Sequence, residues 1–67
     1  MNPTAVIEAL AAGTATEAQR EWARRRCDVL TENRRVFGRL TQEEQQQLKA
    51  LVAGLKQDRE ARHAKLD

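Results

Sequence analysis

Residues 32–55 read ENRRVFGRLTQEEQQQLKALVAGL and carry, in their middle, the signals for one helix end and one helix start. Gly38 can take the left-handed conformation that ends a helix, and Leu40 can pack back as the chain turns. Thr41 and Glu44 have the spacing of a capping box, in which each side chain satisfies a free backbone N–H at a helix start. The stretch therefore predicts a joint between two helices.

An apolar stripe of two helical turns follows this joint: Leu48, Leu51, Val52 and Leu55. Gly54 lies inside the same helix, where it costs about 1 kcal/mol relative to Ala unless it permits close packing. Beyond Leu55, basic side chains occupy the continuation of the stripe. We therefore expect residues 56–67 to be a charged, solvated helical extension.

The segment before the joint predicts a long amphipathic helix over residues 15–37. Thr14 and Glu17 have capping-box spacing at its start. On a helical wheel one broad face is apolar, and it is formed by Ala18, Trp22, Val29, Leu30, Val36 and Phe37. Pairs of opposite charge one turn apart can neutralise each other along this helix: Glu21 with Arg25, Arg24 with Asp28, and Glu32 with Arg35.

A short helix is expected at the start of the chain, over residues 3–12. Asn2 can cap it, Pro3 suits its first turn and Gly13 can end it. Its apolar face is Val6, Ile7 and Leu10. Strand patterns are nearly absent. The sequence thus predicts an all-α fold over residues 1–67 as a single small domain, with a short N-terminal helix and a helical hairpin.

A domain of 67 residues buries only about 60% of its unfolded surface, so a lone chain is marginal. Cys27 cannot form an internal disulfide, and with His63 it supplies too few ligands for a metal site. We therefore expect a homodimer, assembled as a helical bundle, with no metal and no cofactor. A lone cysteine, no secretory signal and no apolar run near 20 residues predict a cytoplasmic protein without a membrane span.

The predicted core and interface residues come from the two long helices and the joint: Trp22, Val29, Leu30, Asn33, Val36, Phe37, Leu40, Leu48, Leu51, Val52 and Leu55. Val36, Phe37 and Leu40 are expected to form the central core with the apolar stripe of the third helix. Arg26 and Asn33 interrupt the apolar face of the second helix at a spacing of seven. They either set the register of a specific helix pairing or lie at its edge, with Arg26 extending along the groove and Asn33 facing solvent.

Charged residues make up 33% of the chain, yet the formal net charge is only +2. Residues 20–39 hold seven arginines and three acidic residues. Arg20, Arg24 and Arg35 are the candidate contacts for a polyanion such as nucleic acid, although a solvated, salt-bridged face explains the same residues better. Cys27 is interpreted as a small half-buried hydrophobe rather than a reactive thiol. No pattern indicates an enzyme.

The run over residues 29–55 resembles the C-terminal part of MarR-type transcription regulators. The matching positions are Val36, Phe37, Leu40, Thr41, Glu43, Glu44, Leu48, Leu51, Val52 and Leu55. The resemblance implies that these two helices serve dimerisation. It does not extend to the winged helix-turn-helix domain, so the family's DNA recognition is carried over to no residue here.

These observations favour a small, non-enzymatic regulatory or inhibitory protein that binds another protein through amphipathic helices, of the kind that phages and other mobile elements encode. A small basic nucleic-acid-binding protein and a structural subunit of a helical assembly are the alternatives. The sequence identifies no partner.

Overall fold

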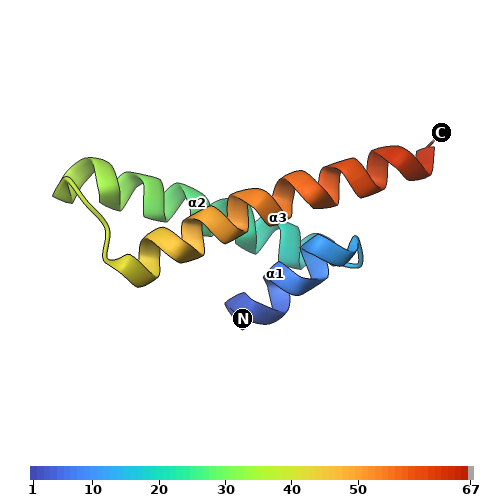
Figure 1. Ribbon diagram of the computed structural model, residues 1–67, viewed down its shortest axis with the longest axis horizontal. Helices are drawn as coiled ribbons and strands as arrows, with labels where there is room; N and C mark the ends of the chain where they lie inside the picture. The colour runs from blue at the N-terminus through green and yellow to red at the C-terminus, as the bar shows by residue number, and fades with distance from the viewer. Residues whose placement is uncertain (67) are drawn as a thin grey trace.

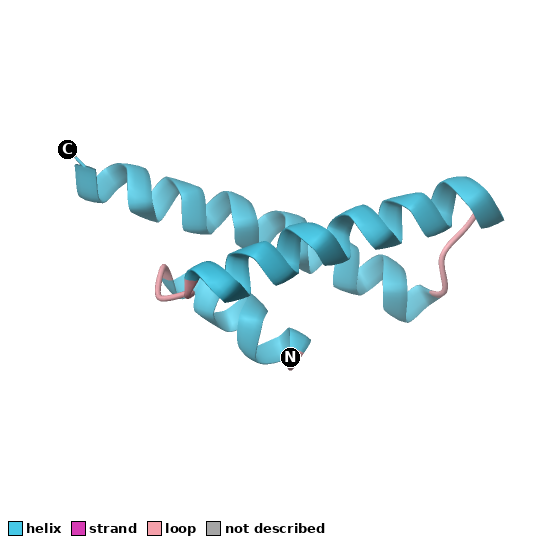
Figure 2. Cartoon of the chain, turned by 180° about the vertical axis from the view of Figure 1, so that it is seen from behind, coloured by secondary structure: helices cyan, strands magenta, loops and turns pink. Residues whose placement is uncertain are grey.

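The computed structural model describes the backbone of residues 1–66 and the side chains of residues 1–64. It contains α1 (Pro3–Ala12), α2 (Glu17–Phe37) and α3 (Gln42–Leu66). The predicted all-α fold is confirmed: α2 and α3 form a long antiparallel hairpin, and α1 packs beside it (Figure 1). Short loops join the helices, and the described residues contain no strand (Figure 2).

The first helix has the predicted bounds and caps. Asn2 Oδ1 accepts hydrogen bonds from the backbone N–H groups of Thr4 and Ala5, at 2.9 and 3.3 Å. Gly13 ends the helix with a φ of 74°, in the left-handed region that favours glycine. A Cβ at Gly13 would lie 3.0 Å from Ala61 Cβ, so the end of α1 is pressed against α3.

The second helix begins two residues later than predicted, and the capping box assigned to Thr14 and Glu17 is wrong. Thr16 Oγ1 accepts from Gln19 N at 3.1 Å, and Gln19 Oε1 accepts from Thr16 N at 2.8 Å. Thr14 instead donates its backbone N–H to the carbonyl of Ala9, at 2.9 Å, and so belongs to the end of α1. Both threonines have a Glu or Gln three residues later, so the local spacing alone does not decide between them.

The joint between α2 and α3 is built as predicted. Gly38 has a φ of 82° and donates its N–H to the carbonyl of Arg34 at 2.8 Å. Thr41 Oγ1 accepts from Glu44 N, and Glu44 Oε1 accepts from Thr41 N, both at 3.1 Å. Leu40 is buried between the two helices. The capping box and the left-handed glycine therefore fix the turn of the hairpin.

The core extends from the crossing of α1 with the hairpin to Leu40 in the joint. It consists of Val6, Leu10, Ala15, Ala23, Leu30, Leu40 and Leu51. Gly54 is buried in α3 against α1, and a Cβ at this position would lie 3.3 Å from Leu10 Cβ. The glycine therefore permits the close approach of α1 and α3 that would offset its cost in helix propensity.

The predicted central core around the joint is only partly correct for the single chain. Leu30, Leu40 and Leu51 are buried, and Leu48, Leu55, Trp22 and Asn33 are half-buried. Four other predicted core or interface residues are exposed: Val29, Val36, Phe37 and Val52. The apolar face of α2 is broader than the strip that α3 covers, and α1 packs far from the joint. Whether these exposed residues form an interface stays a prediction.

The expectation of a charged, solvated helical extension over residues 56–67 is wrong for Asp58, whereas Lys56, Gln57, Arg59 and Glu60 around it are exposed. The helix continues to Leu66, and Asp58 on it is buried against Arg20 of α2. Ala61 is half-buried against the turn after α1. The side chains of residues 65 and 66, and residue 67, lie outside the described part of the chain.

Candidate binding groove

A groove runs between α2 and α3. It consists of two adjoining hollows that share Val52, and no residue of α1 lines either of them. Its apolar lining comes from both helices and comprises Cys27, Leu48, Val52 and Leu55, with buried Leu40 at the end next to the joint. We call this feature the α2–α3 groove.

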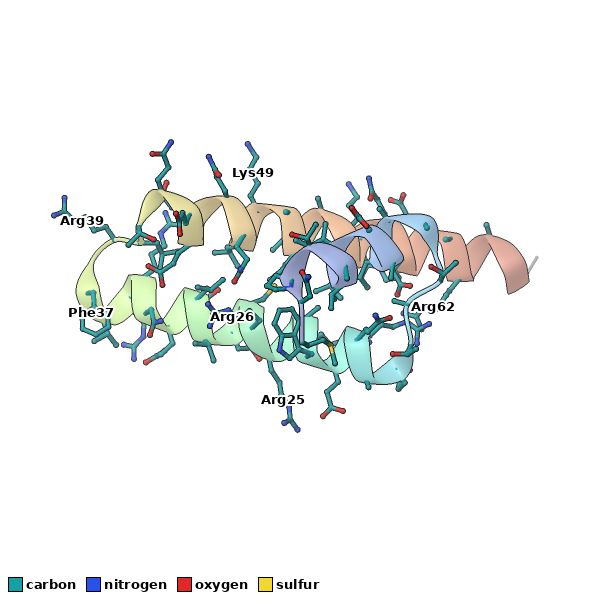
Figure 3. All side chains as sticks on the ribbon, turned by 90° about the horizontal axis from the view of Figure 1, so that it is seen from below. Arg25, Arg26, Phe37, Arg39, Lys49 and Arg62 are labelled. Carbon is teal, nitrogen blue, oxygen red and sulfur yellow. The ribbon has the colours of Figure 1, made fainter. Side chains whose placement is uncertain are left out.

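Basic side chains of both helices and of the joint border the groove: Arg24, Arg34, Arg39, Lys49, Lys56, Arg59 and Arg62. Asp28 and Asp58 are the acidic residues of the lining. Figure 3 shows Arg39 and Lys49 extending outward from the ribbon into solvent. Within residues 1–64, five of these cations have no ion-pair partner: Arg34, Arg39, Lys49, Lys56 and Arg59. The groove therefore combines an apolar surface with uncompensated positive charge.

The sequence did not single out these five cations. Residues 40–67 carry balanced charge, and the arginines of residues 20–39 point in several directions around α2. Only the pairing of α2 with α3 brings cations of both helices to the same groove. Predicting the groove would require the register of that pairing. The local sequence does not give this register, because it depends on the length of the joint and on packing with α1.

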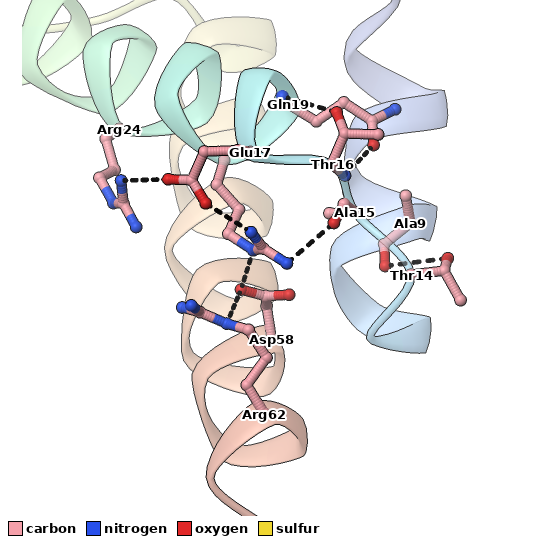
Figure 4. A network of polar contacts seen from close by, with 10 residues as sticks. Ala9, Thr14, Ala15, Thr16, Glu17, Gln19, Arg24, Asp58 and Arg62 are labelled. Carbon is pink, nitrogen blue, oxygen red and sulfur yellow. Dashed lines mark hydrogen bonds and ion pairs between the residues drawn. The ribbon is translucent and has the colours of Figure 1, made fainter. Parts of the chain in front are cut away.

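Arg20, one of the three predicted polyanion contacts, is unavailable for that role because it is part of an internal network with Glu17 and Asp58, both labelled in Figure 4. Its side chain is only 14% exposed. Arg20 Nε donates to Asp58 Oδ2 at 3.0 Å, Nη1 donates to Glu17 Oε2 at 2.8 Å, and Nη2 donates to the carbonyl of Ala15 at 2.9 Å. One guanidinium thus links the α1–α2 loop, the start of α2 and the middle of α3.

Asp58 is the acceptor at the centre of this network. It is 1% exposed, and Arg62 Nε also donates to its Oδ2, at 3.1 Å. Its Oδ1 is buried without a hydrogen-bond partner among the described residues. A buried carboxylate is stable only when its charge is paired and hydrogen-bonded. Asp58 therefore depends strongly on its two arginines.

The other predicted polyanion contacts remain on the surface. Arg24 is half-exposed, borders the groove, and lies 3.9 Å from Glu17, so the predicted pair with Asp28 does not form. Arg35 is bonded to Glu32 as predicted, and this bond raises the pKa of Arg35 above its usual value. Of the three predicted contacts, only Arg24 reaches the groove.

Arg26 and Asn33 are both half-buried on α2. Arg26 Nε donates to Gln47 Oε1 of α3 at 2.8 Å, so this arginine lies in the contact between the two helices of the hairpin. The bond makes Arg26 part of the pairing of α2 with α3 inside one chain. A role for Asn33 in pairing with a second chain stays a prediction.

Cys27 lies in the groove and is half-buried. Burial, and then the nearby charge of Asp28, raise the pKa of its thiol. A thiol of raised pKa holds little thiolate at neutral pH and is a weak nucleophile. This agrees with the interpretation of Cys27 as a small hydrophobe, and its place in the groove makes it part of the apolar lining.

Within the described residues, no group of three or more His, Cys, Asp or Glu side chains is placed to hold a metal ion. His63 is exposed on α3, well apart in sequence from Cys27. None of the helices, over the same residues, combines the length and the apolar character that crossing a bilayer requires.

Comparison of the chain with protein-family models, with curated proteins and with solved structures found no match. The resemblance of residues 29–55 to the dimerisation helices of MarR-type regulators therefore stays a prediction.

Proposed function

We propose that this protein is a small, non-enzymatic regulator that binds an acidic amphipathic helix of another protein in the α2–α3 groove. The observation that carries the proposal is the combination of an apolar lining with five cations that have no ion-pair partner among residues 1–64. By occupying a helix that its partner needs elsewhere, such a protein would act as an inhibitor.

A groove between two helices accepts a third helix through apolar side chains spaced at i, i+3 or i+4, and i+7. Cys27, Leu48, Val52 and Leu55 offer the complementary surface, and the basic residues on both walls match acidic side chains flanking the apolar stripe of the guest. Charges of this kind steer the encounter and reject basic partners. Burial of the apolar lining would supply most of the affinity.

Nucleic acid is the second candidate because the same cations could contact phosphates. Phosphate contacts explain the basic borders of the groove but give the apolar lining no role. Binding through them should fall steeply between about 50 and 200 mM salt, whereas a contact anchored on apolar side chains should fall much less. Salt dependence therefore separates the two candidates.

The test uses a synthetic amphipathic helix of about four turns with leucines on one face and glutamates on the other. A second peptide carries lysines in place of the glutamates, and a short DNA duplex is the third probe. We expect the acidic peptide to bind in fluorescence anisotropy at physiological salt, and the basic peptide not to bind.

Two variants on α3 localise the binding. Val52→Gln removes an apolar side chain of the groove. It should raise the dissociation constant of the acidic peptide about tenfold, a change in binding free energy of about 1.4 kcal/mol. Ala53→Gln alters an exposed neighbour that lines neither hollow and should leave binding unchanged. Equal binding of the acidic and basic peptides would refute the proposal. DNA binding that is lost at higher salt and indifferent to Val52→Gln would favour the second candidate.

A further inference from the structure

A second surface lies on another side of α2. Val29 and Val36 are exposed there, at 47% and 60%, and they lie seven residues apart. Trp22 is a further seven residues before Val29 and is half-buried against the core. Residues seven apart fall nearly above one another on a helix. We call these three residues the α2 stripe, and none of them lines the α2–α3 groove.

Charges of alternating sign border the α2 stripe on its solvent side. In chain order they are Glu21, Arg25, Glu32 and Arg35; Asp28, which lies between them in the sequence, lines the α2–α3 groove instead. Arg25 Nη2 donates to Glu21 Oε1 at 2.7 Å, and Arg35 donates to both carboxylate oxygens of Glu32. The border therefore reads negative, positive, negative, positive from the start of the helix to its end.

This order is complementary to itself when a second copy of the helix runs in the opposite direction. With Val29 near the two-fold axis, Trp22 of each copy lies opposite Val36 of the other. Glu21 then comes near Arg35 of the second copy, and Arg25 near Glu32 of the second copy. Parallel pairing about a two-fold axis would instead place the two charged borders on opposite sides of the seam, where they would not meet.

We propose that two copies of this chain associate through the α2 stripe, with their α2 helices antiparallel. A two-fold axis requires such a self-matching surface. The groove does not match itself, because pairing two grooves would oppose two sets of unpaired cations. The second copy therefore binds at the α2 stripe, and the α2–α3 groove of each copy remains accessible to another partner.

The test exchanges charges while preserving every intrahelical pair and the net charge. One variant combines Glu21→Arg with Arg25→Glu, and the other combines Glu32→Arg with Arg35→Glu. Each variant alone places like charges together at all four positions of its antiparallel dimer. We expect the dissociation constant of each dimer to rise about tenfold or more over the wild type, as followed by sedimentation velocity.

The mixture of the two variants provides the decisive comparison. An antiparallel pair with one chain of each kind opposes unlike charges at all four positions, so the mixture should form a heterodimer with wild-type affinity. A chain carrying all four substitutions should self-associate again. Variants that dimerise as tightly as the wild type, or a mixture that stays monomeric, would overturn the proposal, as would a wild type that is monomeric at about 1 mM.

Substitutions of apolar residues distinguish this surface from the groove. Val29→Asp should abolish the dimer, and circular dichroism should show that the exposed position leaves the helices folded. Val52→Gln should leave the dimer intact. The reverse pattern, in which Val52→Gln disrupts self-association and Val29→Asp does not, would assign the second copy to the groove.

Discussion

Replacing Arg20 with methionine should strongly destabilise the fold, because it leaves Asp58 buried with half of its charge compensation removed. Methionine retains most of the apolar stem of arginine, so the change mainly concerns the guanidinium. Loss of one partner from a buried ion pair costs about 3–5 kcal/mol. Because Arg62 still donates to Asp58 Oδ2, we expect a loss of unfolding free energy at the lower end of this range, about 3 kcal/mol.

This cost is large for a chain of 67 residues, whose total stability is expected to be roughly 3–10 kcal/mol. Urea unfolding followed by circular dichroism measures it. Arg24→Met is the matched control, because Arg24 and Glu17 form an exposed pair outside the α2 stripe whose loss costs about 1 kcal/mol or less. Similar unfolding midpoints for Arg20→Met, Arg24→Met and the wild type would refute the role assigned to the network.

A double variant checks the reasoning further. Asp58→Ala alone leaves Arg20 without its most buried partner and should also destabilise. When Arg20→Met is combined with Asp58→Ala, no uncompensated buried charge remains between them. The loss of unfolding free energy in the double variant should therefore be smaller than the sum of the two single losses, by at least about 1 kcal/mol. Strict additivity would show that the two residues do not act as a pair.

Three further outcomes are expected. Leu51→Ala should lower the free energy of unfolding by about 2–5 kcal/mol because Leu51 is fully buried, whereas His63→Ala should have little effect; equal changes in urea unfolding would contradict the observed core. Gly54→Val should destabilise by about 1–3 kcal/mol in the same assay, since its Cβ would already lie 3.3 Å from a side-chain atom of α1. Cys27 should react more slowly with iodoacetamide at neutral pH than a cysteine in an unfolded peptide, and bound acidic peptide should slow it further; a rate equal to that of the peptide thiol would contradict its raised pKa.

Local signals in the sequence predicted the helices well because helix ends are decided by nearby residues. Asn2, Gly13, Gly38 and the Thr41–Glu44 box act within one turn of the backbone, and each is present in the structure. The start of α2 was misplaced because Thr14 and Thr16 offer equivalent local spacing.

The packing between helices was predicted less well because it depends on residues far apart in the chain. The amphipathic face of α2 indicated which residues are apolar but not which of them α3 would cover. Hence Leu30 is buried, whereas Val36 and Phe37, of similar apolar character, are exposed, Phe37 at 75%. Asp58 was assigned to a solvated tail because its partner Arg20 lies on another helix, and the unpaired cations of the groove were missed for the same reason.

The crossing of α1 over α3 has a consequence for the order in which the chain folds during synthesis. α1 leaves the ribosome before α3, so Leu51, Gly54 and Ala61, on the helix it crosses, are made well after it. A helix of 10 residues is marginal in water on its own. Contacts between distant parts of a chain also delay folding, because a long loop must close before they form. The apolar face of α1 therefore stays uncovered by α3 until most of α3 has been synthesised. During that interval chaperones and proteases can bind it.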